Sequence, residues 1–400
     1  MNIGTRTKFK GPGAFQHYFM KYIYIVIILT LITACAKPKP EMPTVFYPPA
    51  PNPARVQFLT FYTGEKDIYR RKSFFEAFIT GASESGKRLD KAYGVAMREG
   101  KIYASDTNLS VMVFDLEKKE YYQLQGAQGM GKLIQPINIR IDADGGKFVS
   151  DPGRGQVVVF DKNDFYVAAF GSADLWRPVD AVPYEDQLYV ADMKNYCITV
   201  LDKRSGTVLK KIGQTGEPRE RLSRPTNLAF DPEGHLLVSD AGRFQIIKYD
   251  RDGHYLGTIG NQGSESGTFA RPRGIAVDRA GRIFAVDAAF DNVQIFNKDS
   301  YFLMAFGGHG FLPGDLNLPA QVTIDYDNTR YFQQYVDRNF EIEHLVIVSS
   351  QFGERAISIY AVGKERGKSY PTDAEMLKKL KEKLKKSEKD QPAEKKPEPR

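Results

Sequence analysis

The sequence predicts an all-β fold, a six-bladed β-propeller with four-stranded blades, and three observations carry this prediction. One unit recurs at near-constant spacing, and each copy holds four short β-rich runs separated by turn residues. Four strands in a unit of 40 to 50 residues are typical of a propeller blade, whereas a helical solenoid would show a 3.6-residue period. The copies begin near Gln135, Arg177, Arg224, Arg271 and Leu318.

The unit that begins at Pro225 shows the elements most clearly, and the unit from Pro272 repeats them by residue type. Its expected strands are NLAFD, HLLVSD, QIIKYD and YLGTIG, at residues 227–231, 235–240, 245–250 and 255–260. Between them, Asp-Pro-Glu-Gly-His and Asp-Arg-Asp-Gly-His have the composition of hairpin connections. Each blade is therefore expected to be a four-stranded antiparallel meander.

The ring is expected to close between the two ends of the repeat region. Five complete units are visible from Tyr93 onward, but the sixth, from Pro319, lacks a fourth strand. Upstream, SFFEAFITGA at residues 73–82 supplies a strand of the right type. Pairing that strand into the last blade would remove the exposed sheet edge of an open array.

The repeated pattern resembles the NHL family over residues 73–363. Its marks are Pro-x-x-hydrophobic-Ala/Val-hydrophobic-Asp, hydrophobic-Val-Ser/Ala-Asp, aromatic-Asp and Phe/Ile-Gly, while the Trp-Asp mark of Trp-Asp-type propellers is absent. The resemblance implies the propeller fold, but propellers serve as enzymes, ligand binders and scaffolds. NHL-like lyases and lactonase-type propellers hold metal ions at the central channel, so the resemblance also directs attention there.

The N-terminal segment has the pattern of a lipoprotein signal. Residues 22–34 form a run of 13 mostly apolar residues after Lys21, which is short for a membrane span and typical of a secretory signal. Leu-Ile-Thr-Ala-Cys at 31–35 resembles a bacterial lipobox, in which Cys35 would carry the lipid, palmitate included. An uncleaved membrane anchor is the alternative, and either Met1 or Met20 could be the start.

These features divide the chain into four expected parts: a signal peptide at 1–34, a spacer at 35–54, the propeller at 55–368 and a tail at 369–400. Dense prolines favour an extended spacer, and the tail reads as a short cationic helix followed by disorder. The expected location is the bacterial cell envelope. Ala36 after the cysteine favours the outer membrane if the cell has one. The propeller could then face either the periplasm or the cell surface.

The net charge of +7 is unevenly distributed along the chain. The segment before Cys35 carries +4, and residues 364–400 carry 13 basic and 8 acidic groups, or +5, which leaves −2 for the body. A nearly neutral body has no basic face for phosphates. Nucleic acid is therefore not expected as a partner.

Residues that recur in every blade are expected to be structural rather than catalytic. A carboxylate at the end of the second strand should accept hydrogen bonds from backbone N–H groups of the following turn. The arginines before the blade-initial prolines, Arg177, Arg224 and Arg271, are expected to hold adjacent blades together, and Cys197 to be a small core residue. No catalytic set is predicted. The recurring carboxylates are Asp106, Asp151, Asp192, Asp240 and Asp287.

The positions that differ between blades are the candidates for a ligand site, and they should lie at the channel mouth where the innermost strands begin. Asn138, Asp180 and Asn227 could give oxygen ligands to Ca²⁺ or another divalent ion. Arg273 could then hold an anionic group opposite; a water-filled polar channel is the alternative. The full set is Tyr93, Asn138, Asp180, Asn227, Arg273 and Gln321.

The sequence thus favours a lipid-anchored scaffold that binds a protein or glycan partner in the cell envelope through its loop-bearing face. No cofactor is expected. A metal-dependent lyase or lactone hydrolase with its site at the channel mouth is the alternative.

Overall fold

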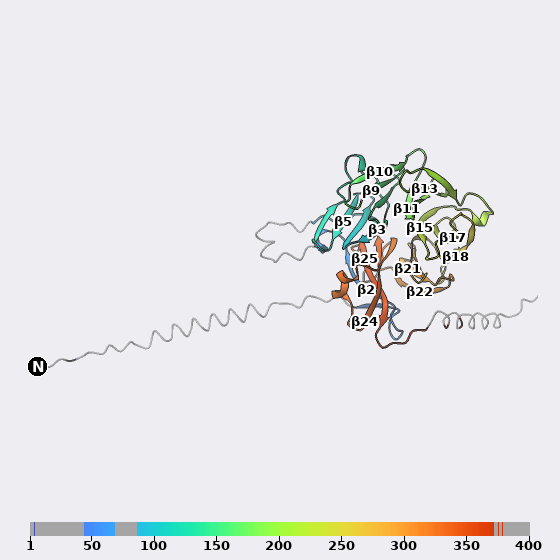
Figure 1. The fold of residues 1–400 in the computed structure, drawn as a ribbon. Coiled ribbons are helices and arrows are strands. Elements are labelled where there is room, and N and C mark those ends of the chain that lie inside the picture. The colour runs from blue at the N-terminus through green and yellow to red at the C-terminus, as the bar shows by residue number, and fades with distance from the viewer. Residues whose placement is uncertain (1–3, 5–43, 69–85, 372–374, 376–377, 379–400) are drawn as a thin grey trace, which may run out of the picture. The chain divides into compact units, whose positions relative to one another are not determined.

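The computed structural model describes residues 4, 44–68, 86–371, 375 and 378, and shows six antiparallel sheets arranged as a propeller (Figure 1). Blade 1 contains β3 (Ala92–Arg98), β4 (Lys101–Asp106), β5 (Val111–Asp115) and β6 (Glu120–Gln123). Blade 2 contains β7 (Asn138–Ile141), β8 (Lys147–Asp151), β9 (Gln156–Phe160) and β10 (Tyr166–Gly171). Blade 3 contains β11 (Pro178–Tyr184), β12 (Gln187–Asp192), β13 (Cys197–Asp202) and β14 (Val208–Ile212).

Blade 4 contains β15 (Pro225–Phe230), β16 (Leu236–Asp240), β17 (Gln245–Tyr249) and β18 (Tyr255–Ile259). Blade 5 contains β19 (Pro272–Val277), β20 (Ile283–Asp287), β21 (Asn292–Phe296) and β22 (Phe302–Gly307). Blade 6 contains β23 (Pro319–Asp325), β24 (Phe340–Ser350), β25 (Ile357–Glu365), β2 (Val56–Tyr62) and β1 (Val45–Tyr47). The described helical turns are α2 (Glu65–Ile68), η1 (Gly129–Gly131), η2 (Pro218–Glu220) and η3 (Thr329–Tyr335).

The ring closes through blade 6, as the sequence predicts, but with a different N-terminal strand. β2 pairs with β25, from Val56 opposite Val362 to Tyr62 opposite Ile357, and Figure 1 shows the two strands side by side. Residues 73–82, the predicted closing strand, lie outside the described residues. Phe58 lies opposite Tyr360 in this pair, edge-on to its ring with the ring centroids 5.4 Å apart, and a register shift follows between Phe58 and Thr60.

The predicted spacer at 35–54 includes residues that belong to blade 6. β1 pairs with β2, and Tyr47 donates a hydrogen bond to the Gly314 carbonyl at 3.0 Å. The prolines therefore do not keep the described part of the stretch, residues 44–54, separate from the propeller. Part of the stretch forms the outer edge of the last blade, where proline is tolerated because that edge has no further partner strand.

The core consists of the faces on which neighbouring blades pack against each other. Every residue of β5, β8, β16 and β20 is buried, because a middle strand of a blade has apolar neighbours on both sides. Cys197 is fully buried at the start of β13, which confirms its predicted core role, and burial raises the pKa of its thiol. No helix among the described residues is long and apolar enough to cross a membrane.

The antiparallel meander gives the propeller two faces. We call one the loop face; it carries the inter-blade loops and the turns between second and third strands, including 124–137, 193–196, 308–318 and 351–356. We call the other the hairpin face; it carries the first-to-second and third-to-fourth connections, including 231–235 and 278–282. The first strand of each blade starts at the loop face.

Candidate functional site: the central channel and the loop face

The recurring aspartates bind backbone N–H groups, as predicted. Asp240 accepts hydrogen bonds from the backbone nitrogens of Gly242 at 3.0 Å and Arg243 at 3.1 Å in the following turn. It also accepts from Ser223 at 2.6 Å and Arg224 at 2.8 Å, just before β15. Each of these carboxylates therefore ties a turn to the inter-blade loop beside it and is not available for chemistry. The other four, Asp106, Asp151, Asp192 and Asp287, make the equivalent bonds.

The rim arginines do not hold blades together through their side chains. Arg177, Arg224 and Arg271 each donate their backbone N–H to the aspartate of their own blade. Their side chains are exposed and form no ion pair with any residue that the structure describes. The mouth of the channel is consequently lined by cations whose charge is not cancelled locally.

The six predicted channel residues occupy two successive positions of the innermost strands. Tyr93 and Arg273 are the second residues of β3 and β19. When the blades are aligned, the other four residues lie one position later along the innermost strand. At the later position, blades 1 and 5 have Gly94 and Gly274. A Cβ on Gly94 would lie 2.7 Å from Oδ1 of Asn138, and one on Gly274 2.7 Å from Oε1 of Gln321. These glycines make room for the polar side chains of the next blade. The remaining four are Asn138, Asp180, Asn227 and Gln321.

An ion pair between blades 2 and 3 crosses the channel wall at this level. Arg140 donates from Nε and Nη2 to the two oxygens of Asp180 at 3.0 Å and 2.6 Å. The Asp180 side chain is fully buried, and it also accepts from the backbone nitrogen of Leu228 at 2.9 Å. A bidentate Arg–carboxylate pair with further hydrogen bonds is the arrangement that best offsets the cost of burying both charges.

The same network reaches across the channel. Arg140 donates to the Leu228 carbonyl of blade 4 at 3.1 Å, past blade 3. The amides of Asn227 and Gln321 lie 2.9 Å apart, which joins blades 4 and 6. With its oxygen toward the guanidinium, Gln321 accepts from Arg140 at 2.9 Å and 2.6 Å, and the charge favours this orientation. Side chains from blades that are not neighbours meet at the axis of the ring, so the network lies within the channel.

The predicted calcium ligands lie beside an arginine in this arrangement, and only some of their oxygens are engaged. Calcium requires six to eight oxygen ligands at about 2.3–2.6 Å. Both oxygens of Asp180 accept from N–H donors. Asn138 donates its amide N–H to the Val179 carbonyl at 2.8 Å, while Oδ1 of Asn138 and Oδ1 of Asn227 are buried without a hydrogen-bond partner among the described residues. The Arg140 guanidinium pairs with Asp180, and its positive charge opposes the binding of a divalent ion beside that carboxylate. The structure thus brings these residues together around an arginine.

Arg140 is the channel residue that the sequence analysis missed. It lies two residues after Asn138, where the innermost strands of the other blades carry Ala96, Val182, Ala229, Ala276 and Thr323. A single charged residue at an otherwise small or apolar position of a repeat is the signal that could have identified it. Arg140 lies farther along the innermost strand than the mouth positions that differ between blades.

Closer to the loop face, Arg273 and Tyr93 form a second contact across the channel. The Arg273 guanidinium lies over the Tyr93 ring, 5.3 Å from its centroid. Blades 5 and 1 are separated by blade 6, so this contact also lies within the channel. Arg273 is 8% exposed. The predicted position of both residues at the channel mouth agrees with this geometry.

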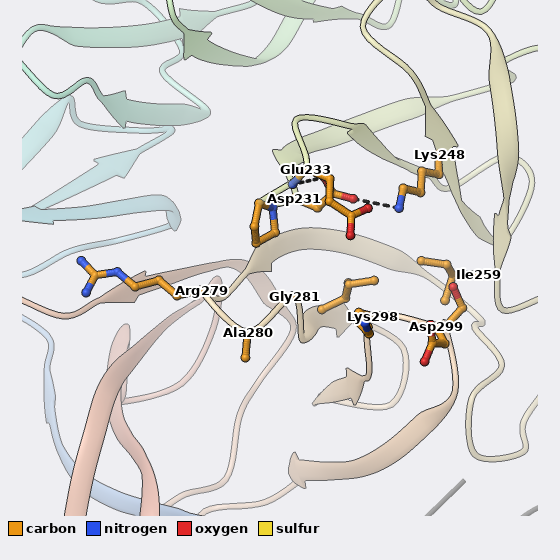
Figure 2. Close-up of a pocket in the computed structure, with 12 residues that line it drawn as sticks. Asp231, Glu233, Lys248, Ile259, Arg279, Ala280, Gly281, Lys298 and Asp299 are labelled. Carbon is orange, nitrogen blue, oxygen red and sulfur yellow. Dashed lines mark hydrogen bonds and ion pairs between the residues drawn. The ribbon is translucent and has the colours of Figure 1, made fainter. Parts of the chain in front are cut away.

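A separate polar pocket of about 330 Å³ lies on the hairpin face between blades 4 and 5 (Figure 2). Asp231, Glu233 and His235 lie close together there, but Asp231 is already bound by Lys248 at 2.8 Å and His235 at 3.0 Å. Burial raises the pKa of Asp231, and the bonds from Lys248 and His235 outweigh this and hold the pKa below its ordinary value. The cluster is a satisfied Asx turn with an ion pair, and it gives no metal site by itself.

The loop face exposes a set of large apolar side chains. Phe311 is 82% exposed and Met130 is 75% exposed. Of the 14 exposed large apolar residues in the described part of the chain, eight are on loop-face segments, four on outermost strands and two on the hairpin face. The eight are Leu109, Met130, Ile134, Leu175, Tyr196, Phe311, Leu312 and Phe352. We call them the loop-face apolar set.

Comparisons with known proteins support the fold. No protein-family model matches the chain. A Bacteroides thetaiotaomicron protein of unknown function aligns with a TM-score of 0.55 at 14% identity, covering 78% of this chain and 76% of that one. An auxiliary nutrient-binding protein of the same organism aligns with a TM-score of 0.52 at 11% identity, covering 78% of each chain.

A gluconolactonase from Xanthomonas campestris aligns with a TM-score of 0.51 at 16% identity, covering 81% of this chain and 99% of that one. Similarity at these identities shows the six-bladed propeller and does not carry a function across. The function has to be argued from the surface and the channel of this chain.

Proposed function

We propose that this protein is a lipid-anchored, extracytoplasmic propeller of the NHL-repeat type that binds a protein partner through its loop face. The loop-face apolar set is the observation that supports this most directly. Exposed apolar surface on one face of a soluble protein is a feature of interaction sites, and this set gathers on one face. The outer strands and the hairpin face carry far fewer.

The composition of the set favours a protein over a glycan. Met130, Ile134, Leu175 and Leu312 are aliphatic, and aliphatic side chains pack against apolar protein surface. Methionine, aromatic residues and arginine are enriched at protein interfaces. The exposed rim arginines, Arg177, Arg224 and Arg271, lie on the same face, so the expected partner has an apolar patch flanked by acidic groups.

The anchor on Cys35 would hold the propeller at a membrane surface, with the residues between Cys35 and β1 as a short link. A tethered module with an apolar face is suited to assembling with another envelope protein, because tethering raises the local concentration of both partners. Cys35 and the segment before it lie outside the described residues, so the anchor rests on the sequence pattern.

The binding proposal is tested by site-specific photocrosslinking in cells that express the full chain. A photoreactive residue is placed at Met130 or Phe311 on the loop face, and at Val208 or Leu256 on the outermost strands as matched exposed controls. We expect one discrete crosslinked protein from the loop-face positions and none from the controls. Equal labelling from all four positions would contradict a loop-face partner, and a glycan recovered instead would replace the protein proposal.

The alternative, a metal-dependent lyase or lactone hydrolase, has less support because Arg140 already pairs with Asp180, one of its proposed metal ligands. It is tested by metal analysis of the full chain purified without chelator. A stoichiometric divalent ion that is lost in Asp180→Ala would favour the enzyme over the scaffold.

A further inference from the structure

Arg273 is a buried cation inside the mouth of the channel. It lies on β19, and its side chain extends across the channel to the ring of Tyr93 in blade 1. Only 8% of Arg273 is exposed, and its Nη1 atom is buried without a hydrogen-bond acceptor among the described residues. Burying a guanidinium removes its hydration, so the loss has to be offset by an acceptor.

The other well-buried cations of the propeller each have a carboxylate. Arg140 pairs with Asp180 at 2.6 Å and Lys147 with Asp164 at 2.6 Å. Arg282 pairs with Asp278. Arg273 forms no ion pair with the part of the chain that the structure describes. This difference sets Arg273 apart as a cation with an open position for an anion.

Two more guanidinium groups act on the same place. Burial lowers the pKa of Arg273; the nearby Tyr93 opposes this, and the charges of Arg271 and Arg224 lower the pKa further. The nearest rim carboxylates are engaged elsewhere, since Asp287 accepts the backbone N–H of Arg271 at 3.1 Å and Asp240 that of Arg224 at 2.8 Å. The charges of Arg271 and Arg224 thus add to the positive charge of Arg273 at the channel mouth.

We infer that the channel mouth binds the oxyanion of a small ligand, a carboxylate, phosphate or sulfate group, with Arg273 as its main partner. The planar fork of a guanidinium matches two oxygens of such a group. Tyr93 supplies an aromatic wall beside it, and the exposed Arg224 and Arg271 extend the positive field toward the loop face. The main partner, Arg273, lies inside the channel and is not part of the loop-face apolar set, although Arg224 and Arg271 belong to both surfaces.

The inference is tested by thermal unfolding of the full chain with added phosphate, sulfate or glucuronate, at constant ionic strength made up with chloride. We expect a saturable rise in Tm with at least one of the three oxyanions, because a ligand that binds only the folded state stabilises it. A response to glucuronate alone identifies a carboxylate site, and a response to phosphate or sulfate alone identifies a tetrahedral oxyanion site. No saturable rise with any of them overturns the inference.

Variants locate the site. Arg273→Gln should weaken oxyanion binding by roughly tenfold or more. The Arg224→Gln/Arg271→Gln double variant changes only exposed side chains, so it should fold normally and still bind more weakly than the wild type. Arg177→Gln is the matched control, an exposed rim arginine that does not act on Arg273. Equal affinity in the wild type, the double variant and Arg177→Gln would overturn the inference.

Discussion

Single residues decide what the channel of this propeller can do. The Arg140 and Asp180 pair turns a predicted cation site into a region already filled by a cation. Asp180 alone would attract a metal, but a bidentate guanidinium satisfies both of its oxygens. The identity of one residue in blade 2 therefore changes the chemistry expected of a residue in blade 3.

Removing Arg140 should destabilise the fold strongly. Arg140→Met leaves Asp180 buried without its countercharge, and we expect a loss of about 3 kcal/mol in the free energy of unfolding. Urea unfolding measures it. Arg177→Met, which changes an exposed arginine, should cost less than about 0.5 kcal/mol. Comparable losses in both variants would show that Arg140 is not structurally coupled to Asp180.

His344 makes stability depend on pH. It is 1% exposed, packs against Phe284 and Tyr326, and lies near Arg282, Arg279, Asp278 and Glu343. Burial first and the Arg282 charge second lower its pKa from 6.5 to about 4. The unfolded chain therefore takes up a proton first as pH falls, and this contribution to stability is lost between about pH 6.5 and about pH 4.

We expect the contribution of His344 to lower the free energy of unfolding by about 3 kcal/mol when the pH drops from about 7 to about 4. His344→Phe should remove that part of the slope, measured by urea unfolding across the range. His309→Gln, at an exposed histidine, is the control and should keep the wild-type slope. An unchanged slope in His344→Phe would contradict the assignment.

At the scale of elements, the closing blade depends on strands from both ends of the propeller. β2 contributes Phe58, which is 3% exposed and contacts Tyr360 of β25. β24 and β25 come from the C-terminal side, so the ring is complete only when segments separated by about 300 residues pair. A closure of this kind leaves only one exposed strand edge in blade 6, the short β1.

A cavity in the closing strand should therefore weaken the whole fold. We expect Phe58→Ala to lower the free energy of unfolding by about 3–4 kcal/mol, as large buried aromatic deletions do. Val208→Ala on the outermost strand of blade 3, where the side chain is half exposed, should cost less than about 0.5 kcal/mol. Similar small losses in both variants would show that β2 is dispensable for closure.

At the scale of the whole molecule, the two faces have different chemistry. The loop face carries the loop-face apolar set together with the rim cations, and the hairpin face carries Asx turns with ion pairs such as Asp231 with Lys248. The propeller body is nearly neutral overall, so this separation rather than the net charge is what a partner would recognise.

The lipid anchor predicts where the intact protein is found. Cys35→Ser should move the protein from the membrane fraction to the soluble extracytoplasmic fraction, because a thioether-linked lipid can no longer form. Cys197→Ala, which removes the buried cysteine of β13, should leave the protein in the membrane fraction. Fractionation with labelled fatty acid measures both. Retention of Cys35→Ser in the membrane would favour the uncleaved anchor.

The sequence by itself determined the blade architecture, because β-rich runs, turn residues and the aspartates at the second-strand ends recur at fixed spacing and depend only on local chemistry. It also placed Asp180, Asn227 and Arg273 at the channel. Tertiary structure decided which strand closes the ring and what those residues contact. Val56–Tyr62 and residues 73–82 are both plausible strands locally, and only pairing with β25 distinguishes them. Arg140 reaches Asp180 from another blade, a contact between positions 40 residues apart that no local pattern encodes.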